Sequence, residues 1–204
     1  MIVVKCFYLN AVYNMNTPTL ETDRLILRKF TENDIEALFL ILKDEEVNRF
    51  LPWFPLKDIE ETKKFYAERY AVKYEQPQAY AYAICLKDDN YPIGYVKVDM
   101  EEHHDFSYGL RKEFWHRGIA SEAGKAVVER VKKYITATHD RNNPRSGNVM
   151  QVCGIKYCYT YEELWQPKNF LVEFRLYQLN FTKEENWMYK EYWDKYPIHF
   201  IEKL

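Results

Sequence analysis

One glycine lies where a strand-like segment gives way to a helix-like one, and this junction constrains the fold more than any other part of the chain. Residues 105–110 have the pattern of a strand, and from Ile119 to Val131 an apolar residue recurs every four positions, as on one face of a helix. A chain that turns through Gly118 into a helix directs unpaired N–H groups and the positive end of the helix dipole into one small space. The junction predicts an α/β fold with an anion site, although Gly118 alone would equally suit a tight connection without a ligand.

The residues around this junction resemble the signature of a known family. From Ser107 to Ala123 the chain reads Ser-Tyr-Gly-Leu-Arg-Lys-Glu-Phe-Trp-His-Arg-Gly-Ile-Ala-Ser-Glu-Ala, which resembles the acyl-CoA signature of the GNAT superfamily of N-acetyltransferases, and most of all its RimJ/RimL-type branch. In that signature, Gln/Arg-x-x-Gly-x-Gly/Ala, Trp115 takes the first position, Gly118 the glycine and Ala120 the last. Trp115 departs from the pattern, but the resemblance implies that backbone amides rather than this side chain hold the pyrophosphate of coenzyme A.

Further segments resemble landmarks of the same family, in the family's order. They are residues 20–28 (the first strand), 50–53 (the loop between the first two helices), 142–150 with Gly154 (the Asn-x-x-Ser segment and its following glycine) and 173–177 (an Asp/Glu-x-x-x-Tyr). Ile155 stands where the family has phenylalanine. Because several weak motifs in the right order are more specific than any one of them, the resemblance extends over most of the chain.

The resemblance and the residue pattern together predict a single-domain GNAT fold of the α/β class, with a mixed central sheet of about seven strands flanked by helices. The expected order is βααβββαβαββ. Strands are predicted at residues 21–30, 78–87, 93–100, 105–110, 135–139, 155–164 and 171–181, and helices at 31–43, 58–74, 119–134 and 142–153.

The acetyltransferase domain is expected to cover residues 18–181. Residues 1–17 would be an N-terminal extension, either disordered or an over-extended start. Residues 182–204 carry Trp and Tyr side chains near helical spacing, which predicts an aromatic-rich helical extension packed on the domain or across a dimer. A wall of the substrate pocket is the alternative role for these rings.

Charge and cysteine content limit the classes of partner. The net charge of −2 argues against a general nucleic-acid surface, yet residues 111–145 carry nine Lys/Arg against four Asp/Glu, so this segment is +5 and the remainder −7. A basic segment in the middle of the chain suits a polyphosphate cofactor, and the acidic remainder of the chain suits a cationic amine substrate. No apolar run is long enough to cross a bilayer, so no membrane partner is expected. Four cysteines without a CxxC pair indicate reduced thiols, a cytoplasmic location and no metal site.

Acetyl-CoA is the cofactor that the resemblance implies, with coenzyme A as the product. The thioester would lie beside residues 106–110, and a splay between this strand and residues 135–139 would admit the pantetheine arm. The residues implied for the cofactor are Tyr108, Gly109, Leu110, Trp115, His116, Arg117, Gly118, Ile119, Ala120, Ser121, Asn143 and Ser146.

The acid that protonates the leaving thiolate is where the sequence departs from the pattern of many relatives. Many relatives have a tyrosine four residues after the small residue of the Asn-x-x-Ala/Ser motif, but here that position holds Met150, which cannot donate a proton. Ser146 matches the serine that the RimJ/RimL-type branch often uses instead, and is the predicted acid. A plain hydroxyl on the helix surface is the alternative.

The base is expected among carboxylates and imidazoles on the acceptor side. Glu162 and Glu163 lie on a strand that faces the acceptor in the family, and the alternation of side chains lets only one of them point inward. The hairpin turn offers Glu101, Glu102, His103 and His104. The predicted substrate-binding residues are Trp53, Phe54 and Glu101, although Trp53 would equally anchor its loop.

These observations predict an N-acetyltransferase that moves the acetyl group of acetyl-CoA to a primary amine by direct attack, with a protein or peptide N-terminal α-amine as the preferred acceptor. A small-molecule amine acetyltransferase acting on an antibiotic or polyamine is the first alternative. A CoA-binding protein without turnover, suggested by Met150, is the second. A monomer or a homodimer is expected.

Overall fold

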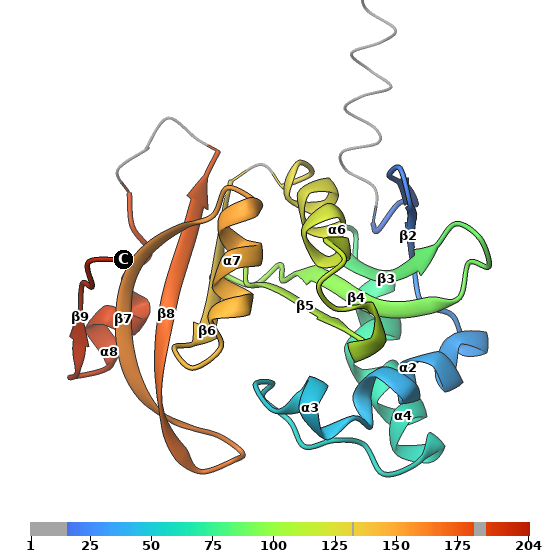
Figure 1. Cartoon of the computed structure of the whole chain (residues 1–204), viewed down its shortest axis with the longest axis horizontal. Helices are drawn as coiled ribbons and strands as arrows, with labels where there is room; N and C mark the ends of the chain where they lie inside the picture. Colours follow the sequence, from blue (N-terminus) through green and yellow to red (C-terminus); the bar gives the residue numbers. More distant parts are fainter. Residues whose placement is uncertain (1–15, 132, 182–186) are drawn as a thin grey trace, which may run out of the picture.

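The computed structural model describes residues 16–131, 133–181 and 187–204, and within them it contains two antiparallel sheets (Figure 1). The first has the order β1-β2-β3-β4-β5, and the second the order β6-β8-β7-β9. The strands are β1 (Leu20–Glu21), β2 (Leu25–Arg28), β3 (Tyr80–Leu86), β4 (Pro92–Val98), β5 (Phe106–Leu110), β6 (Tyr134–Asp140), β7 (Lys156–Trp165), β8 (Phe170–Asn180) and β9 (His199–Phe200). The predicted α/β class is confirmed, with the strands divided between two sheets.

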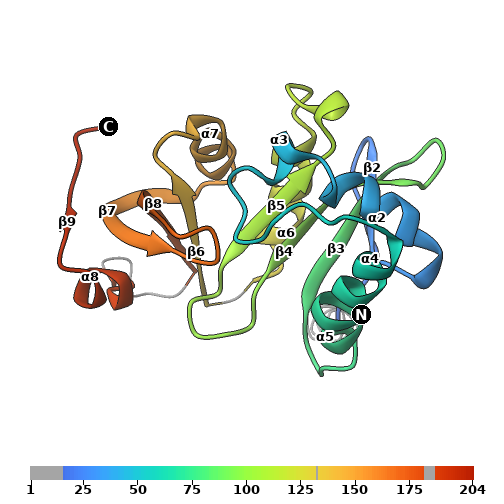
Figure 2. The same ribbon diagram turned by 90° about the horizontal axis from the view of Figure 1, so that it is seen from below.

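Helices cover both faces of the strands. They are η1 (Glu32–Asp34), α2 (Ile35–Leu42), α3 (Glu45–Asn48), α4 (Ile59–Tyr66), η2 (Ala67–Ala71), α5 (Val72–Tyr74), η3 (Lys112–Phe114), α6 (Ile119–Val128), α7 (Pro144–Val152) and α8 (Glu191–Lys195). In Figure 1, α6 and α7 lie on the upper side, and α2, α3 and α4 on the lower side. Figure 2, seen from below, brings the lower group to the front.

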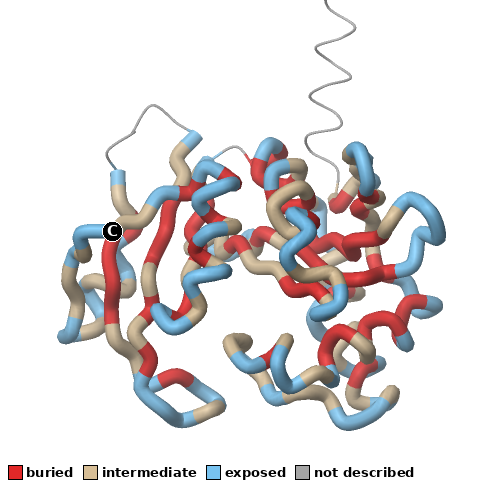
Figure 3. The backbone as a smooth tube through the Cα atoms, in the orientation of Figure 1, coloured by how far each residue is buried: buried red, intermediate tan, exposed pale blue. Residues whose placement is uncertain are grey.

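Alternation along β4 shows how one strand serves two cores. Val96 and Val98 belong to the core that includes residues of α6, whereas Tyr95 belongs to the core that includes Leu38 of α2 and Tyr70 of η2. Because successive side chains point to opposite faces, a strand buried on both faces reads as a nearly continuous apolar run. Figure 3 accordingly shows buried backbone through the middle of the sheet and exposed backbone in the outer turns.

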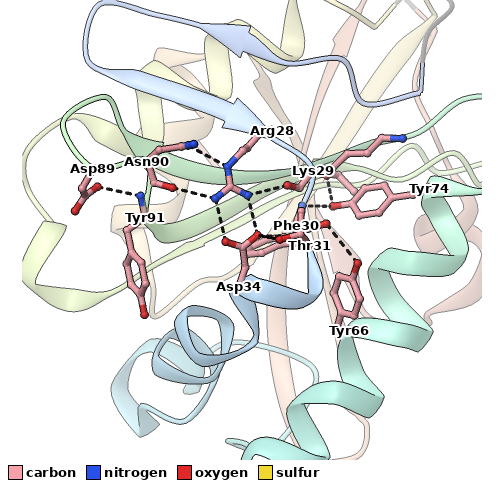
Figure 4. Close-up of polar contacts among 11 residues, drawn as sticks. Arg28, Lys29, Phe30, Thr31, Asp34, Tyr66, Tyr74, Asp89, Asn90 and Tyr91 are labelled. Carbon is pink, nitrogen blue, oxygen red and sulfur yellow. Dashed lines mark hydrogen bonds and ion pairs between the residues drawn. The ribbon is translucent and has the colours of Figure 1, made fainter.

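A buried ion pair fixes the start of the first long helix. Arg28 donates to both carboxylate oxygens of Asp34 at 2.7 and 2.9 Å, and to the backbone oxygen of Asn90 at 2.9 Å (Figure 4). The backbone N–H of Thr31 also donates to Asp34, at 2.8 Å, as expected for a capped helix start. Burial alone would raise the pKa of Asp34, but these donors outweigh it and hold the pKa below its usual value.

Two helices differ from their predicted bounds. The helix after Gly118 ends at Val128 rather than near residue 134, because the backbone N–H groups of Arg130 and Val131 turn back to residues three before them. The short helix α3 lies where no helix was predicted, and it is held at its start by Asp44. That carboxylate accepts from the N–H groups of Glu46 and Val47 at 2.9 and 3.1 Å. Among the described residues, no helix is long and apolar enough to span a membrane.

The C-terminal segment is less helical than its spacing predicts, over the part that the structure describes. Only Glu191–Lys195 form a helix, and His199–Phe200 then pair with β7 as an edge strand. Pro197 explains the end of α8, since the residue before a proline is disfavoured in the helical region. The rings of Tyr192 and Tyr196 stack on Tyr161 of β7 at 4.8 and 5.2 Å, so the segment packs on the domain. Residues 1–15 and 182–186, on which parts of the predicted extensions fall, lie outside the described residues.

Candidate active site

A cleft of about 1090 Å³ opens where β5 and β6 part. The two strands are joined by one parallel bridge, Asp105 to Thr136, beside which the N–H of Thr136 donates to the backbone oxygen of His104 at 3.2 Å. Beyond this bridge, β5 pairs with β4 and β6 pairs with β8, and Figure 2 shows β5 and β6 diverging. The splay expected between these segments is therefore present, and both strands line the cleft.

The junction around Gly118 lies at one end of this cleft. Gly118 has a left-handed backbone, φ +73°, and its carbonyl accepts from the N–H of Glu122 at 3.0 Å. The N–H groups of the three residues between them have no acceptor within the helix and are available to an anion. Arg24 braces the turn, since it pairs with Glu122 at 2.6 Å and donates to the backbone oxygen of Arg117 at 2.9 Å. The sequence offered no sign of this role for Arg24.

Most of the residues predicted for the cofactor line the cleft. They are Tyr108, Gly109, Leu110, Trp115, His116, Gly118, Ile119, Ala120, Ser121, Asn143 and Ser146. Arg117 does not line it; its side chain is exposed, with the guanidinium 5.5 Å from the centre of the Phe114 ring. The backbone N–H of Trp115 is also occupied, as it donates to Lys112 at 3.1 Å, while its indole N–H donates to the backbone oxygen of Leu110 at 2.9 Å.

Ser146 on α7 faces Tyr108 on β5. The Tyr108 hydroxyl donates to Ser146 Oγ at 2.9 Å and approaches the Ser146 carbonyl at 3.3 Å. Burial raises the pKa of Tyr108, so its hydroxyl stays protonated. Met150, one turn further along α7, is 2% exposed and packs in the core. Asn143 caps α7 without a side-chain hydrogen bond to the helix, which leaves its carboxamide available to a ligand.

The half of the cleft where the acceptor was expected is lined by β7 and by the C-terminal segment. Glu163 lines it and Glu162 does not, as the alternation along β7 requires. Burial raises the pKa of Glu163, although Tyr196 and Lys195 partly oppose the shift. The neighbouring lining residues are mainly aromatic, namely Tyr161, Trp165, Phe174, Tyr192 and Tyr196.

Asp105 is a lining carboxylate that sequence reasoning missed. It precedes β5 at the single bridge, and burial raises its pKa to about 6, against the opposing charges of Lys97 and His103. The missed signal was its position: it begins the strand beside which the thioester was expected, on the same side as Ser107 and Gly109.

Two residues predicted to bind the acceptor lie elsewhere. Glu101 is exposed at the turn between β4 and β5, and Phe54 is 60% exposed outside the cleft, because the chain after Trp53 turns away. Trp53 does line the cleft, and its indole N–H donates to Asn48 at 2.9 Å. The same loop is tied to the turn between β7 and β8 by Lys168, whose ammonium donates to two backbone oxygens, including that of Asn48 at 2.8 Å.

His139 on β6 is buried and lines the cleft, but only one of its ring nitrogens is bonded. Nδ1 lies 2.8 Å from the backbone oxygen of Asp140, and Nε2 has no partner among the described residues. Burial lowers the pKa of His139, which favours the neutral ring. Gly147 of α7 lies close to the ring, since a Cβ added there would be 2.7 Å from Nε2.

One group of potential metal ligands occurs among the described residues, Asp99, Glu101 and His103, with ligand atoms within 4.8 Å of one another. Asp99 already accepts from Lys73 at 3.0 Å and from the backbone N–H of Glu101 at 2.7 Å. These bonds occupy the carboxylate in an ordinary hairpin turn.

Comparison with known proteins identifies the fold and the family. The family model described as "Acetyltransferase (GNAT) domain" matches residues 24–156, well over half of the chain. The uncharacterized N-acetyltransferase YoaA of Bacillus subtilis is 30% identical over 115 residues, which are 54% of this chain and 64% of that protein. The chain thus spans just under two thirds of the length of this relative.

Solved structures show the same fold. A GNAT-family acetyltransferase from Bacillus anthracis superposes with a TM-score of 0.69 at 22% identity, covering 80% of this chain and 98% of that one. The ribosomal L7/L12 α-N-protein acetyltransferase RimL, in complex with coenzyme A, superposes with a TM-score of 0.66 at 18% identity, covering 80% and 98%. The family match, the fold and the parted strands agree, and the chain belongs to the GNAT acetyltransferase domain family.

Proposed function

We propose that this protein transfers the acetyl group of acetyl-CoA to a primary amine, and that the preferred acceptor is a protein or peptide N-terminal α-amine. The observation that carries the proposal is the cleft between β5 and β6. It has a helix start with unpaired N–H groups at one end and the carboxylates of Asp105 and Glu163 on the acceptor side. A polyanionic cofactor and an amine thus meet where the strands part.

The cofactor would be held mainly by backbone. The N–H groups of Ile119, Ala120 and Ser121 would bind its pyrophosphate, assisted by the dipole of α6. Its pantetheine arm would pass between β5 and β6, within reach of the Asn143 carboxamide. When bound, acetyl-CoA supplies the thioester that the amine attacks.

Two proton transfers fall to side chains. Asp105 and Glu163 are the candidates to take the proton that the amine must lose before it attacks. Ser146 would give a proton to the departing thiolate. Because Tyr108 donates to Ser146 Oγ, the Ser146 hydrogen is left free to point elsewhere and is polarised as a donor. This pair would replace the tyrosine that Met150 displaces.

A small amine is the second candidate acceptor. The bridge from Lys168 to the loop around Asn48 limits access to the acceptor half, and its aromatic lining suits a compact ligand. Resemblance to RimL supports a peptide α-amine instead. The two acceptors share the chemistry of the transfer step.

The deciding experiment is acetyl transfer from acetyl-CoA in a mixed pool of N-terminal peptides, polyamines and aminoglycosides, read by mass spectrometry. A gain of one acetyl group on a peptide α-amine supports the proposal, and gain on a small amine selects the second candidate. Binding of acetyl-CoA without any transfer, in a pool that a known acetyltransferase does modify, would favour a CoA-binding protein without turnover.

Two further parts of the expected organisation are proposals. We place the acetyltransferase domain at residues 18–181, with residues 182–204 as an extension that contributes Tyr192, Lys195 and Tyr196 to the cleft. A cytoplasmic location is in keeping with the free thiols of Cys85, Cys153 and Cys158.

A further inference from the structure

On the acceptor face of the first sheet, Lys97 of β4 lies directly opposite Ser107 of β5. Residues paired in this way project from the same face of a sheet, and both line the cleft. This face is opposite to the one that carries Tyr108, because Tyr108 follows Ser107 and side chains alternate along a strand. Lys97 and Ser107 therefore lie on the side that the amine would occupy, away from α6 and α7.

The ammonium of Lys97 has no direct counter-ion among the described residues: no carboxylate oxygen lies within 4.0 Å of it. The nearby Asp99 is occupied by Lys73 at 3.0 Å. Burial lowers the pKa of Lys97, while the charges of Asp105 and Asp99 oppose the shift. A half-buried ammonium without a bonded partner is costly unless a ligand pairs with it.

Ser107 also lacks a bonded partner, although its polar group is uncharged. Its hydroxyl oxygen is buried and has no hydrogen-bond partner in the described structure, and neither has the hydroxyl of Tyr95, two residues before Lys97 on the same face. The Tyr95 ring reaches over Gly109, where an added Cβ would lie 2.6 Å from it. Buried hydroxyls usually find hydrogen-bond partners, so the unpartnered hydroxyl of Ser107, which lines the cleft opposite Lys97, can bond to a polar group of the acceptor.

We propose that Lys97 and Ser107 form a subsite for a carboxylate carried by the acceptor, close to the amine that is acetylated. This inference rests on the proposed function and names its substrate class. An acceptor with both charges fits the arrangement, since Asp105 and Glu163 attract the amine while Lys97 and Ser107 bind the acid. The carboxylate is either that of a free α-amino acid or that of an acidic side chain near the start of a peptide.

The test uses the coenzyme A-loaded protein and two pairs of acetylated products, so it does not depend on turnover. N-acetyl-L-tyrosine and N-acetyltyramine differ by the α-carboxylate alone. N-acetyl-Ser-Asp amide and N-acetyl-Ser-Asn amide differ by a side-chain carboxylate. Calorimetric Kd values are measured for the wild type, Lys97→Met, Ser107→Ala and, as a control, Lys156→Met, which removes an exposed lysine of β7.

The acid member of one pair is expected to bind the wild type and the control at least tenfold more tightly than its neutral partner, and the pair concerned identifies the source of the carboxylate. Lys97→Met should abolish that preference and Ser107→Ala should weaken it. The melting temperature of Lys97→Met should be unchanged or higher, because the variant removes a half-buried ammonium that has no carboxylate within ion-pair distance.

Equal binding of acid and neutral members in both pairs, or a preference that survives in Lys97→Met, would overturn the subsite. The same outcome follows if Lys97→Met weakens both members alike. Absence of acetyl transfer to every amine, together with a Lys97-dependent preference for the acid, would reject the proposed function and leave the subsite standing.

Discussion

The hydroxyl of Tyr108 on β5 donates a hydrogen bond of 2.9 Å to the hydroxyl oxygen of Ser146 on α7, across the mouth of the parted strands. The two residues are 38 positions apart, and the bond links the strand beside which the thioester would lie to the helix that carries the proposed acid. We therefore expect the two hydroxyls to act together in the transfer step, and this gives the first prediction.

Tyr108→Phe should lower kcat about 10-fold to 100-fold with little change in the Kd of acetyl-CoA, because it removes a hydrogen bond that polarises Ser146 and leaves the ring in place. Ser146→Ala should lower kcat at least as much, and the double variant should be no worse than Ser146→Ala. Steady-state kinetics with separate calorimetry of acetyl-CoA makes the comparison. Additive losses would show that the two hydroxyls act independently.

Gly118→Asp should weaken acetyl-CoA binding at least tenfold. A Cβ added at position 118 would have only Arg24 Nη2 nearby, at 3.6 Å, so there is room for a side chain. The φ angle of +73° is strained for a residue with a side chain, and the aspartate carboxylate would repel the phosphates. Gly118→Asn is the matched control, because asparagine tolerates this backbone and carries no charge. Calorimetry should show the tightest acetyl-CoA binding for the wild type, weaker binding for Gly118→Asn and the weakest for Gly118→Asp. Equal affinities for all three would contradict the anion site.

Gly147→Ala should disturb the position of Ser146. The added Cβ would lie 2.7 Å from His139 Nε2 and 3.1 Å from Tyr177 Oη, so α7 must move away from β6. Overpacking of this kind costs about 1–3 kcal/mol of folding free energy. For Gly147→Ala, the free energy of unfolding measured with denaturant and kcat should both fall. Val152→Ala, at an exposed position of the same helix, should change neither.

If Asp105 takes the amine proton, kcat/KM should rise as the pH increases through about 6, because its raised pKa keeps the carboxyl protonated below that value and unable to accept a proton. Asp105→Asn should remove this limb of the profile, and Glu163→Gln should preserve it. A limb that persists in Asp105→Asn and disappears in Glu163→Gln would assign the proton to Glu163.

Glu202→Gln should lower the free energy of unfolding by about 2 kcal/mol. The Glu202 carboxylate accepts from Arg175 at 2.7 and 3.0 Å and from Thr160 at 2.5 Å, and the Arg175 hydrogen bonds lower its pKa to about 2. A lowered carboxyl pKa stabilises the fold above the usual pKa, and this contribution is lost as the pH falls from near 4.5 toward 2. The stability difference between wild type and variant should shrink over that range in chemical denaturation.

The matched control for this prediction is Glu173→Gln. Glu173 pairs with Arg141 at 2.7 Å, but both side chains are about 40% exposed, so water screens the pair and the loss should be much smaller than in Glu202→Gln. Equal losses in the two variants would contradict a special role for Glu202 in holding the C-terminal segment.

Local pattern determined the fold class and the proposed cofactor end of the site. The apolar repeat after Gly118, the alternation in the strands and the capped start at Thr31 are properties of neighbouring residues, and the elements they predict are present. The proposed anion site follows from local pattern too, since a helix start carries unpaired N–H groups whatever surrounds it. Alternation also selected one of the two glutamates of β7, although it could not say which.

Tertiary structure decided which side chains line the proposed acceptor half of the cleft. Glu101 and Phe54 looked suitable by type and position, but the turns that carry them face solvent. Asp105 and Lys97 looked ordinary in sequence, and they acquire their character from the parting of β5 from β6 and from the side chains that bury them. Burial and the pairing of charges depend on residues that are distant in sequence. A local pattern therefore cannot show whether a charged side chain has an ion-pair partner in the fold.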